Sequence, residues 1–330
     1  MKNAQSVIRQ RSFRLILQRP RKSFARTVQN AAAIPKFRPL SKAAIGAGGV
    51  VGRFVGRLLN ADLHPSKAPA QQTQLSVKIM SVSIDIREES GIRTLHFGSE
   101  WTQGAMRIAR PWNLELDYTK EMMASLLLRD ETRFPRKVLL IGLGAASLTK
   151  FLYRNQPLAN LTVVEIEPGV VAAARQFFKL PEDPKRLKIV IGDGAEFLAN
   201  SDQTYDLILV DGFDANARAG VLDTLPFYQV VRAHLSEDGI MAVNLLGHSR
   251  GFKDSVERIR SAFDGRVLAF PSCDSGNAIA FAAAGEPICI SMDDLKDQAL
   301  ILKKEIGLNL LATLTRLEQA KTCKGGMLEI

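Results

Sequence analysis

The stretch RKVLLIGLGAAS, residues 136–147, decides the fold of this chain. Its apolar run at 138–141 leads into a G-x-G turn, formed by Gly142 and Gly144, and an amphipathic segment follows. Such a run predicts a parallel strand buried on both faces, and the amphipathic segment predicts a helix. Small residues let a ligand approach the backbone, and a helix N-terminus offers free N–H groups. The stretch therefore predicts a nucleotide-binding βα unit, although an ordinary tight turn has the same pattern.

Three further predicted strands each end in an acidic residue. The strands and the residues at their ends are 161–167 with Glu165, 187–191 with Asp193 and Gly194, and 205–210 with Asp211. Glu165 follows Gly142 by 23 residues, close to the spacing of about 20 at which a carboxylate meets a nucleotide ribose. Ligands bind at the carboxyl edge of such sheets, so the three acids are candidate binding residues; capping of turns or helices is the alternative.

The glycine turn also restricts the kind of nucleotide. A dinucleotide fingerprint requires a third glycine where Ser147 stands, and the chain contains no G-x-x-x-x-G-K-[ST] motif for triphosphates. A glycine-poor turn beside carboxylates suits a ligand without phosphates. We therefore expect an S-adenosyl sulfonium compound.

Charge is distributed unevenly along the chain. The net charge is +10, but residues 1–75 hold 14 Lys or Arg residues and one acid, Asp62, whereas the remainder carries 30 basic and 33 acidic residues. We expect residues 1–74 to be a weakly ordered extension without a catalytic role. A transit peptide, a nucleic-acid-binding arm and a start at Met80 are the alternatives. The apolar segment 45–59 is too short and too charged to span a bilayer.

Cysteine and histidine are too sparse to predict a metal site. The three cysteines and four histidines show no ligand-like spacing: Cys273, Cys289, Cys323, His64, His96, His234 and His248. Unpaired cysteines are typical of a reducing compartment, so we expect a cytoplasmic protein without a bound metal.

The other segments predict how the βα unit is embedded. Alternation between 75 and 106, including a strand at 77–79, predicts a small antiparallel β-unit. The remaining predicted elements are helices at 114–129, 227–235, 252–263 and 295–320, a lid-like loop at 215–223, and strands at 239–245, 266–269 and 278–283. Together they predict an α/β fold, a doubly wound seven-stranded mostly parallel sheet behind a β-hairpin domain. The predicted parts are the extension (1–74), hairpin domain (75–118), nucleotide-binding domain (119–290) and C-terminal helical tail (291–330).

The order of these motifs resembles the spermidine synthase (polyamine aminopropyltransferase) family, over roughly residues 77–284. The matching motifs are WTQGAM with Gln103, LDYTKEM with Tyr118, GLGAAS at 142–147, VEIEP with Glu165, GDGAEFL with Asp193, and VDGFDA with Asp211 and Asp214. The resemblance implies a methyltransferase fold that uses decarboxylated S-adenosylmethionine or S-adenosylmethionine as a co-substrate, not as a permanently bound cofactor. It also implies transfer to a small-molecule amine. We further expect a homodimer, no membrane span and no nucleic-acid partner.

The same resemblance implies roles for individual residues. Asp211 is the expected base, Tyr118 orients the amine, and Asp214 attracts its charge. On the co-substrate side, Glu165 is the expected ribose acid and Asp193 the adenine-side acid. The other expected co-substrate-binding residues are Gly142, Gly144, Gly194 and Gln103.

Three positions depart from the family pattern. Ala145 stands where the family carries an aspartate beside the aminopropyl group. After Tyr118, Thr119 and Lys120 precede Glu121, where the family has a His or Gln and then Glu. After Asp211 the chain reads Gly-Phe-Asp-Ala, where the family has Ser-Ser-Asp-Pro. We therefore expect weak discrimination between the two forms of the co-substrate, and a Lys120 that opposes polyamine binding. A methyltransferase and a non-catalytic nucleoside-binding homologue are the alternatives, and the acceptor is left open.

Overall fold

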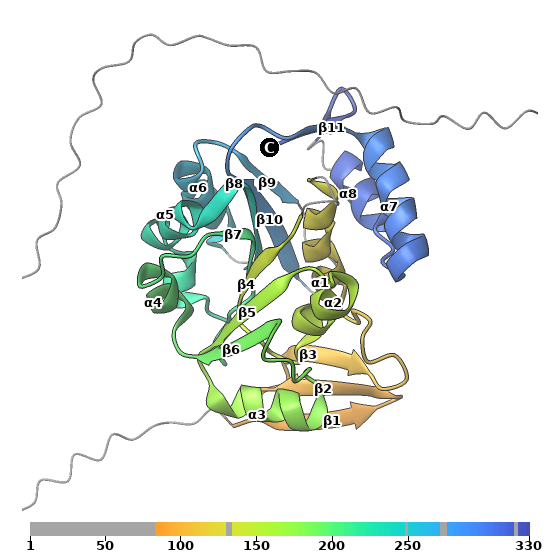
Figure 1. Cartoon of the computed structure of the whole chain (residues 1–330), viewed down its shortest axis with the longest axis vertical. Coiled ribbons are helices and arrows are strands. Elements are labelled where there is room, and N and C mark those ends of the chain that lie inside the picture. Colours follow the sequence, from red (N-terminus) through yellow and green to blue (C-terminus); the bar gives the residue numbers. More distant parts are fainter. Residues whose placement is uncertain (1–82, 130–133, 248–249, 271–275, 320–322) are drawn as a thin grey trace, which may run out of the picture. The chain divides into compact units, whose positions relative to one another are not determined.

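The computed structural model describes residues 83–129, 134–247, 250–270, 276–319 and 323–330 (Figure 1). These residues form a small N-terminal sheet, a seven-stranded sheet with helices on both faces, and a C-terminal segment with two helices and a third sheet. The extension and the strand expected at 77–79 lie outside the described residues. Within the described ranges, no helix combines the length and the apolar character needed to cross a membrane.

The N-terminal sheet is antiparallel, as the alternating sequence predicted. Its strands, in the order β1-β2-β3, are β1 (Asp85–Glu89), β2 (Ile92–His96) and β3 (Thr102–Arg107). Leu95 of β2 and Met106 of β3 are buried against the main core. This burial fixes β3 beside the central domain, where it supplies part of the site.

The central sheet has the strand order β6-β5-β4-β7-β8-β10-β9. Its strands are β4 (Lys137–Ile141), β5 (Asn160–Glu165), β6 (Leu187–Ile191), β7 (Tyr205–Val210), β8 (Leu235–Leu246), β9 (Val267–Phe270) and β10 (Asn277–Ala283). Strands β4 to β8 are parallel, and β10 is antiparallel to β8 and β9. The predicted doubly wound, seven-stranded sheet is confirmed. Its order reverses at β4, where folds of this type bind ligands.

Both faces of the central sheet are buried, as its apolar strands predicted. Val138 and Leu140 of β4 face one core with α2 and α3, whereas Leu139 and Ile141 face a second core with α4, α5 and α6. The helix predicted over 114–129 is shorter in the structure, where α1 runs into the 3₁₀ turn η1. The helical elements are α1 (Asp117–Met122), η1 (Met123–Leu127), α2 (Ser147–Asn155), α3 (Pro168–Phe177), α4 (Gly194–Ala199), η2 (Gly220–Asp223), α5 (Leu225–Ala233) and α6 (Phe252–Ala262).

The C-terminal segment differs from the prediction of one long helix at 295–320. The structure has two helices, α7 (Met292–Ile306) and α8 (Leu311–Gln319). Gly307 lies at φ 73° and ends α7 in the left-handed conformation that glycine adopts readily. A third sheet, of order β11-β13-β12, was not predicted, because strands of two or three residues show no period. These strands are β11 (Cys289–Ser291), β12 (Cys323–Lys324) and β13 (Met327–Glu329).

The end of β4 lies unusually close to the end of β7. Gly142 has φ 96°, and a Cβ at this position would lie 2.1 Å from the carbonyl oxygen of Asp211. The backbone N–H of Asp211 donates to the carbonyl of Ile141 at 2.9 Å. Only glycine fits between these backbones, so the first glycine of the turn is required by packing as well as by its φ angle.

We predict that Gly142→Ala destabilises the protein by at least about 2 kcal/mol, because overpacking and a strained backbone each cost about 1–3 kcal/mol. Gly192→Ala is the matched control, since a Cβ at Gly192 meets no atom within 4 Å. It should change stability by less than about 0.5 kcal/mol. Urea denaturation of both variants measures the difference, and equal stabilities would contradict the packing argument.

Candidate functional site

A cavity of about 480 Å³ lies at the carboxyl edge of the central sheet. Residues of β3, α1, β8 and the loops after β4 to β7 line it. All nine predicted site residues are among them: Gln103, Tyr118, Gly142, Gly144, Glu165, Asp193, Gly194, Asp211 and Asp214. In the part of the chain that the structure describes, no group of three or more His, Cys, Asp or Glu side chains is arranged to hold a metal ion.

The glycine turn after β4 packs against the N-terminal sheet. A Cβ on Gly104 of β3 would lie 2.6 Å from the Cβ of Ala145, so the two backbones approach closely. The Ser147 hydroxyl, at the start of α2, donates to the carbonyl of Ala105 at 3.0 Å. Ala146 adopts the left-handed conformation, with φ 57°. Contacts with β3 thus hold the turn, and β3 forms one wall of the cavity.

Backbone N–H groups hold Glu165 in place. Its two carboxylate oxygens accept hydrogen bonds from the N–H of Leu143 at 2.8 Å and of Glu167 at 2.9 Å. Burial raises the pKa of Glu165, and the backbone hydrogen bonds oppose this shift. Glu165 is only 7% exposed, so this acid is buried although it stands at the end of a strand. The carboxylate is held beside the glycine turn and is well placed to accept hydroxyl hydrogen bonds.

Asp193 caps a helix and also lines the cavity. One carboxylate oxygen accepts hydrogen bonds from the N–H of Ala195 at 2.8 Å and of Glu196 at 2.9 Å, at the start of α4. A Cβ on Gly194 would lie 2.4 Å from a methyl group of Ile141, so α4 begins tightly against β4. Asp193 is therefore a helix cap, as the alternative interpretation predicted. Capping uses one carboxylate oxygen and leaves the other for a ligand.

Side chains from two other elements hold Asp211. The Tyr118 hydroxyl on α1 donates to Oδ2 at 3.1 Å, and the Asn244 amide on β8 donates to Oδ1 at 2.8 Å. Burial raises the pKa of Asp211, while the hydrogen bonds from Asn244 and Tyr118 act in the opposite direction. A carboxylate of this kind can accept a proton from a substrate within the cavity.

Sequence reasoning missed Asn244. It is 5% exposed, lines the cavity, and its amide oxygen has no hydrogen-bond partner among the described residues. A signal was present, because Asn244 is the one polar residue in the otherwise apolar run 240–246, IMAVNLL. A buried polar group needs a partner. The carboxylate of Asp211 meets that need for the amide nitrogen.

Asp214 organises the loop that follows β7. It is exposed, and one of its oxygens accepts hydrogen bonds from the N–H of Asn216 at 2.8 Å and of Arg218 at 2.9 Å. The loop expected as a lid at 215–223 contains η2 and contributes six of its residues, Ala217 to Leu222, to the cavity lining. The carboxylate therefore shapes this wall of the cavity.

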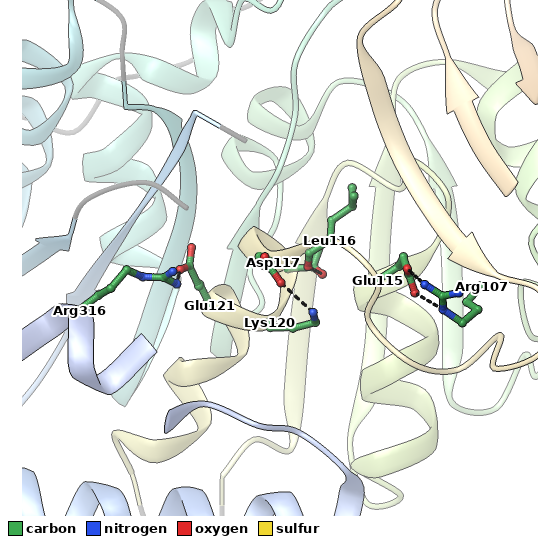
Figure 2. Close-up of polar contacts among 8 residues, drawn as sticks. Arg107, Glu115, Leu116, Asp117, Lys120, Glu121 and Arg316 are labelled. Carbon is green, nitrogen blue, oxygen red and sulfur yellow. Dashed lines mark hydrogen bonds and ion pairs between the residues drawn. The ribbon is translucent and has the colours of Figure 1, made fainter. Parts of the chain in front are cut away.

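Figure 2 shows the side chains of Lys120 and Glu121, which follow Tyr118 in α1. Lys120 forms an ion pair with Asp117 at 2.7 Å and is not among the residues that line the cavity. The expectation that Lys120 opposes amine binding is therefore wrong. Glu121 is buried and forms an ion pair with Arg316 of α8. Of the positions that depart from the family pattern here, Thr119 lines the cavity, whereas Lys120 and Glu121 form ion pairs away from its lining.

Comparison with known proteins identifies relatives of this chain. The model of the spermine/spermidine synthase domain matches residues 116–263. The polyamine aminopropyltransferase of Chromobacterium violaceum is 34% identical over 268 residues, which cover 81% of this chain and 100% of that protein. A probable spermidine synthase from Corynebacterium glutamicum has a TM-score of 0.54 at 19% identity, covering 66% of this chain and 83% of its own. Human methyltransferase-like protein 13 in complex with SAH has a TM-score of 0.52 at 24% identity. The match covers 58% of this chain and 93% of that protein's chain.

The strand order and the cavity at its switch point are those of the methyltransferase fold, and the polyamine aminopropyltransferase relatives identify the protein as a transferase. More particularly, the chain belongs to the spermine/spermidine synthase family, because it matches the domain model and aligns with the full length of a polyamine aminopropyltransferase at 34% identity. The two solved structures establish the fold alone. The family resemblance that the motif order predicted is confirmed.

We predict that Asp211→Asn raises the melting temperature near pH 7. Because burial raises the pKa of Asp211, the folded protein binds this proton more tightly than the unfolded chain does. The native state therefore loses stability as pH rises from the unfolded toward the folded pKa, and the variant avoids this loss. Its advantage should vanish below about pH 4, the ordinary Asp range, where both states are protonated.

Thermal denaturation between about pH 3.5 and pH 8 measures this effect. Asp202→Asn is the control, because Asp202 is an exposed acid outside the cavity lining and should show no such difference. A lower melting temperature for Asp211→Asn at pH 7 would show that Asp211 stabilises the fold.

Proposed function

We propose that the protein transfers the aminopropyl group of decarboxylated S-adenosylmethionine to a primary amine. The observation that carries this proposal is the carboxylate of Asp211, held by Tyr118 and Asn244 inside the cavity. Membership of the spermine/spermidine synthase family supports it, as does the polyamine aminopropyltransferase that aligns over its whole length.

The reaction is a displacement at carbon. The amine nitrogen attacks the methylene carbon next to the sulfonium and forms a new C–N bond. The C–S bond breaks, and its electron pair stays on sulfur, so methylthioadenosine leaves as a neutral thioether. Asp211 accepts the proton that the amine loses, and its raised pKa makes it a stronger base than an exposed carboxylate. Tyr118 holds the carboxylate in position through its hydroxyl.

The nucleoside half of the co-substrate fits the opposite side of the cavity. Glu165 is proposed to accept hydrogen bonds from the two ribose hydroxyls, and Asp193 to face the adenine. Gly142, Gly144 and Gly194 keep the backbone open beside them, and Gln103 lines the same cavity. Close backbone packing at these glycines supports the assignment, because side chains there would displace the walls.

Ala145 determines how the co-substrate is chosen. It lines the cavity without a charge, so no carboxylate at this position repels S-adenosylmethionine, which differs from the decarboxylated form by one carboxylate. We therefore propose weak discrimination between the two compounds. Methyl transfer from S-adenosylmethionine is the second candidate function that this observation favours. The expected homodimer and cytoplasmic location stay predictions.

We predict that the purified protein releases methylthioadenosine from decarboxylated S-adenosylmethionine in the presence of an amine, with slow turnover of putrescine. Asp211→Asn should lower kcat by at least about 100-fold, since a positioned base contributes about 10²–10⁴. Mass spectrometry of both products measures the transfer, and Asp202→Asn again serves as the control.

Three other results of this assay would change the assignment. Rapid spermidine formation with strict selection of the decarboxylated form would contradict the role of Ala145. A methylated product would favour the second candidate function. Tight nucleoside binding without any transfer would favour a non-catalytic homologue.

A further inference from the structure

The charged side chains that line the cavity do not match a simple diamine. Four carboxylates and one guanidinium are present: Glu165, Asp193, Asp211, Asp214 and Arg218. The first two acids belong to the proposed nucleoside side, and Asp211 is the proposed base. The distal end of an acceptor therefore meets Asp214 together with a positive charge. An acceptor with a second ammonium alone would be repelled by that charge.

The backbone of Arg218 is fixed although its side chain is exposed. Its N–H donates to the Asp214 carboxylate at 2.9 Å, and its carbonyl accepts from the N–H of Asp214 at 3.0 Å. In the described part of the chain, the guanidinium has no ion pair or hydrogen bond, whereas Arg232 on α5 and Arg258 on α6 are paired with acids. The loop thus presents an unpaired guanidinium at the cavity, close to Asp214.

A second unmatched group lies beside the base. The amide oxygen of Asn244 is buried and has no hydrogen-bond partner among the described residues, while the amide nitrogen donates to Asp211. An amide oxygen only accepts hydrogen bonds. Its natural partner in the cavity is an N–H group of the reacting amine. Next to Asp211, the cavity therefore favours a hydrogen-bond donor of the acceptor molecule. At the loop after β7, it presents the carboxylate of Asp214 and the guanidinium of Arg218.

We propose that the acceptor is an α-amino acid that carries a primary amine on its side chain. Arg218 binds its carboxylate, since a guanidinium matches a carboxylate with two parallel hydrogen bonds. Asp214 binds its α-ammonium group. The side-chain amine donates to the amide oxygen of Asn244, passes its proton to Asp211 and attacks the methylene carbon, and methylthioadenosine leaves with the sulfur electron pair. This inference rests on the proposed aminopropyl transfer.

Ornithine and putrescine test the inference, because the two compounds differ by one carboxylate. Wild-type protein with decarboxylated S-adenosylmethionine should show a higher kcat/KM for ornithine than for putrescine. Arg218→Gln should raise the KM for ornithine by about 10–100-fold, the effect of losing a charge-assisted hydrogen bond. It should lower the KM for putrescine, because the repulsion of the distal ammonium is removed. Arg175→Gln, on the exposed face of α3 and outside the cavity lining, is the matched control and should change neither value.

Other outcomes overturn the inference. A wild-type preference for putrescine, or equal effects of Arg218→Gln on both acceptors, would show that Arg218 binds no acceptor carboxylate. If Arg218→Gln instead changes the selection between S-adenosylmethionine and its decarboxylated form, the carboxylate that Arg218 binds belongs to the co-substrate. Transfer to putrescine alone leaves the proposed function intact, whereas transfer to no amine contradicts the proposed function itself.

Discussion

A carboxylate buried at the edge of a parallel sheet must be matched by hydrogen-bond donors, and this requirement determines how the site is built. Glu165 is matched by two backbone N–H groups, so the glycine turn and the end of β5 hold each other in place. Asp211 is matched by Tyr118 and Asn244, which bring α1 and β8 to the end of β7. The elements that satisfy these acids are also the walls of the cavity.

The two sides of the cavity are held by different kinds of contact. On the proposed nucleoside side, backbone groups and closely packed glycines fix the geometry, so few substitutions are tolerated. On the acceptor side, the loop after β7 is arranged by Asp214, and its charged groups extend from an exposed segment. Changes on this side leave the sheet intact. The residues of the acceptor side can therefore vary while the backbone of the co-substrate side keeps its geometry.

Local sequence predicted the doubly wound sheet and the acids at its carboxyl edge, because apolar strands with turns at their carboxyl ends are typical of such a sheet. The prediction that Lys120 lies near the amine was incorrect, because proximity in sequence does not show on which face of α1 a side chain lies. The ion pair with Asp117 shows that Lys120 lies on another face. Asn244 was missed because its role depends on a neighbouring strand. The break at Gly307 was missed because the helical period continues on both sides of it.

The central claim is that the buried acids at the sheet edge form a nucleoside site, and calorimetry with methylthioadenosine tests it most directly. Glu165→Gln should weaken binding by about 2–3 kcal/mol, the value of a hydrogen bond to a charged group. Glu167→Gln is the control, because Glu167 caps α3 and does not line the cavity. The account predicts a loss of affinity in the first variant alone. Unchanged affinity in a folded Glu165→Gln protein would contradict it.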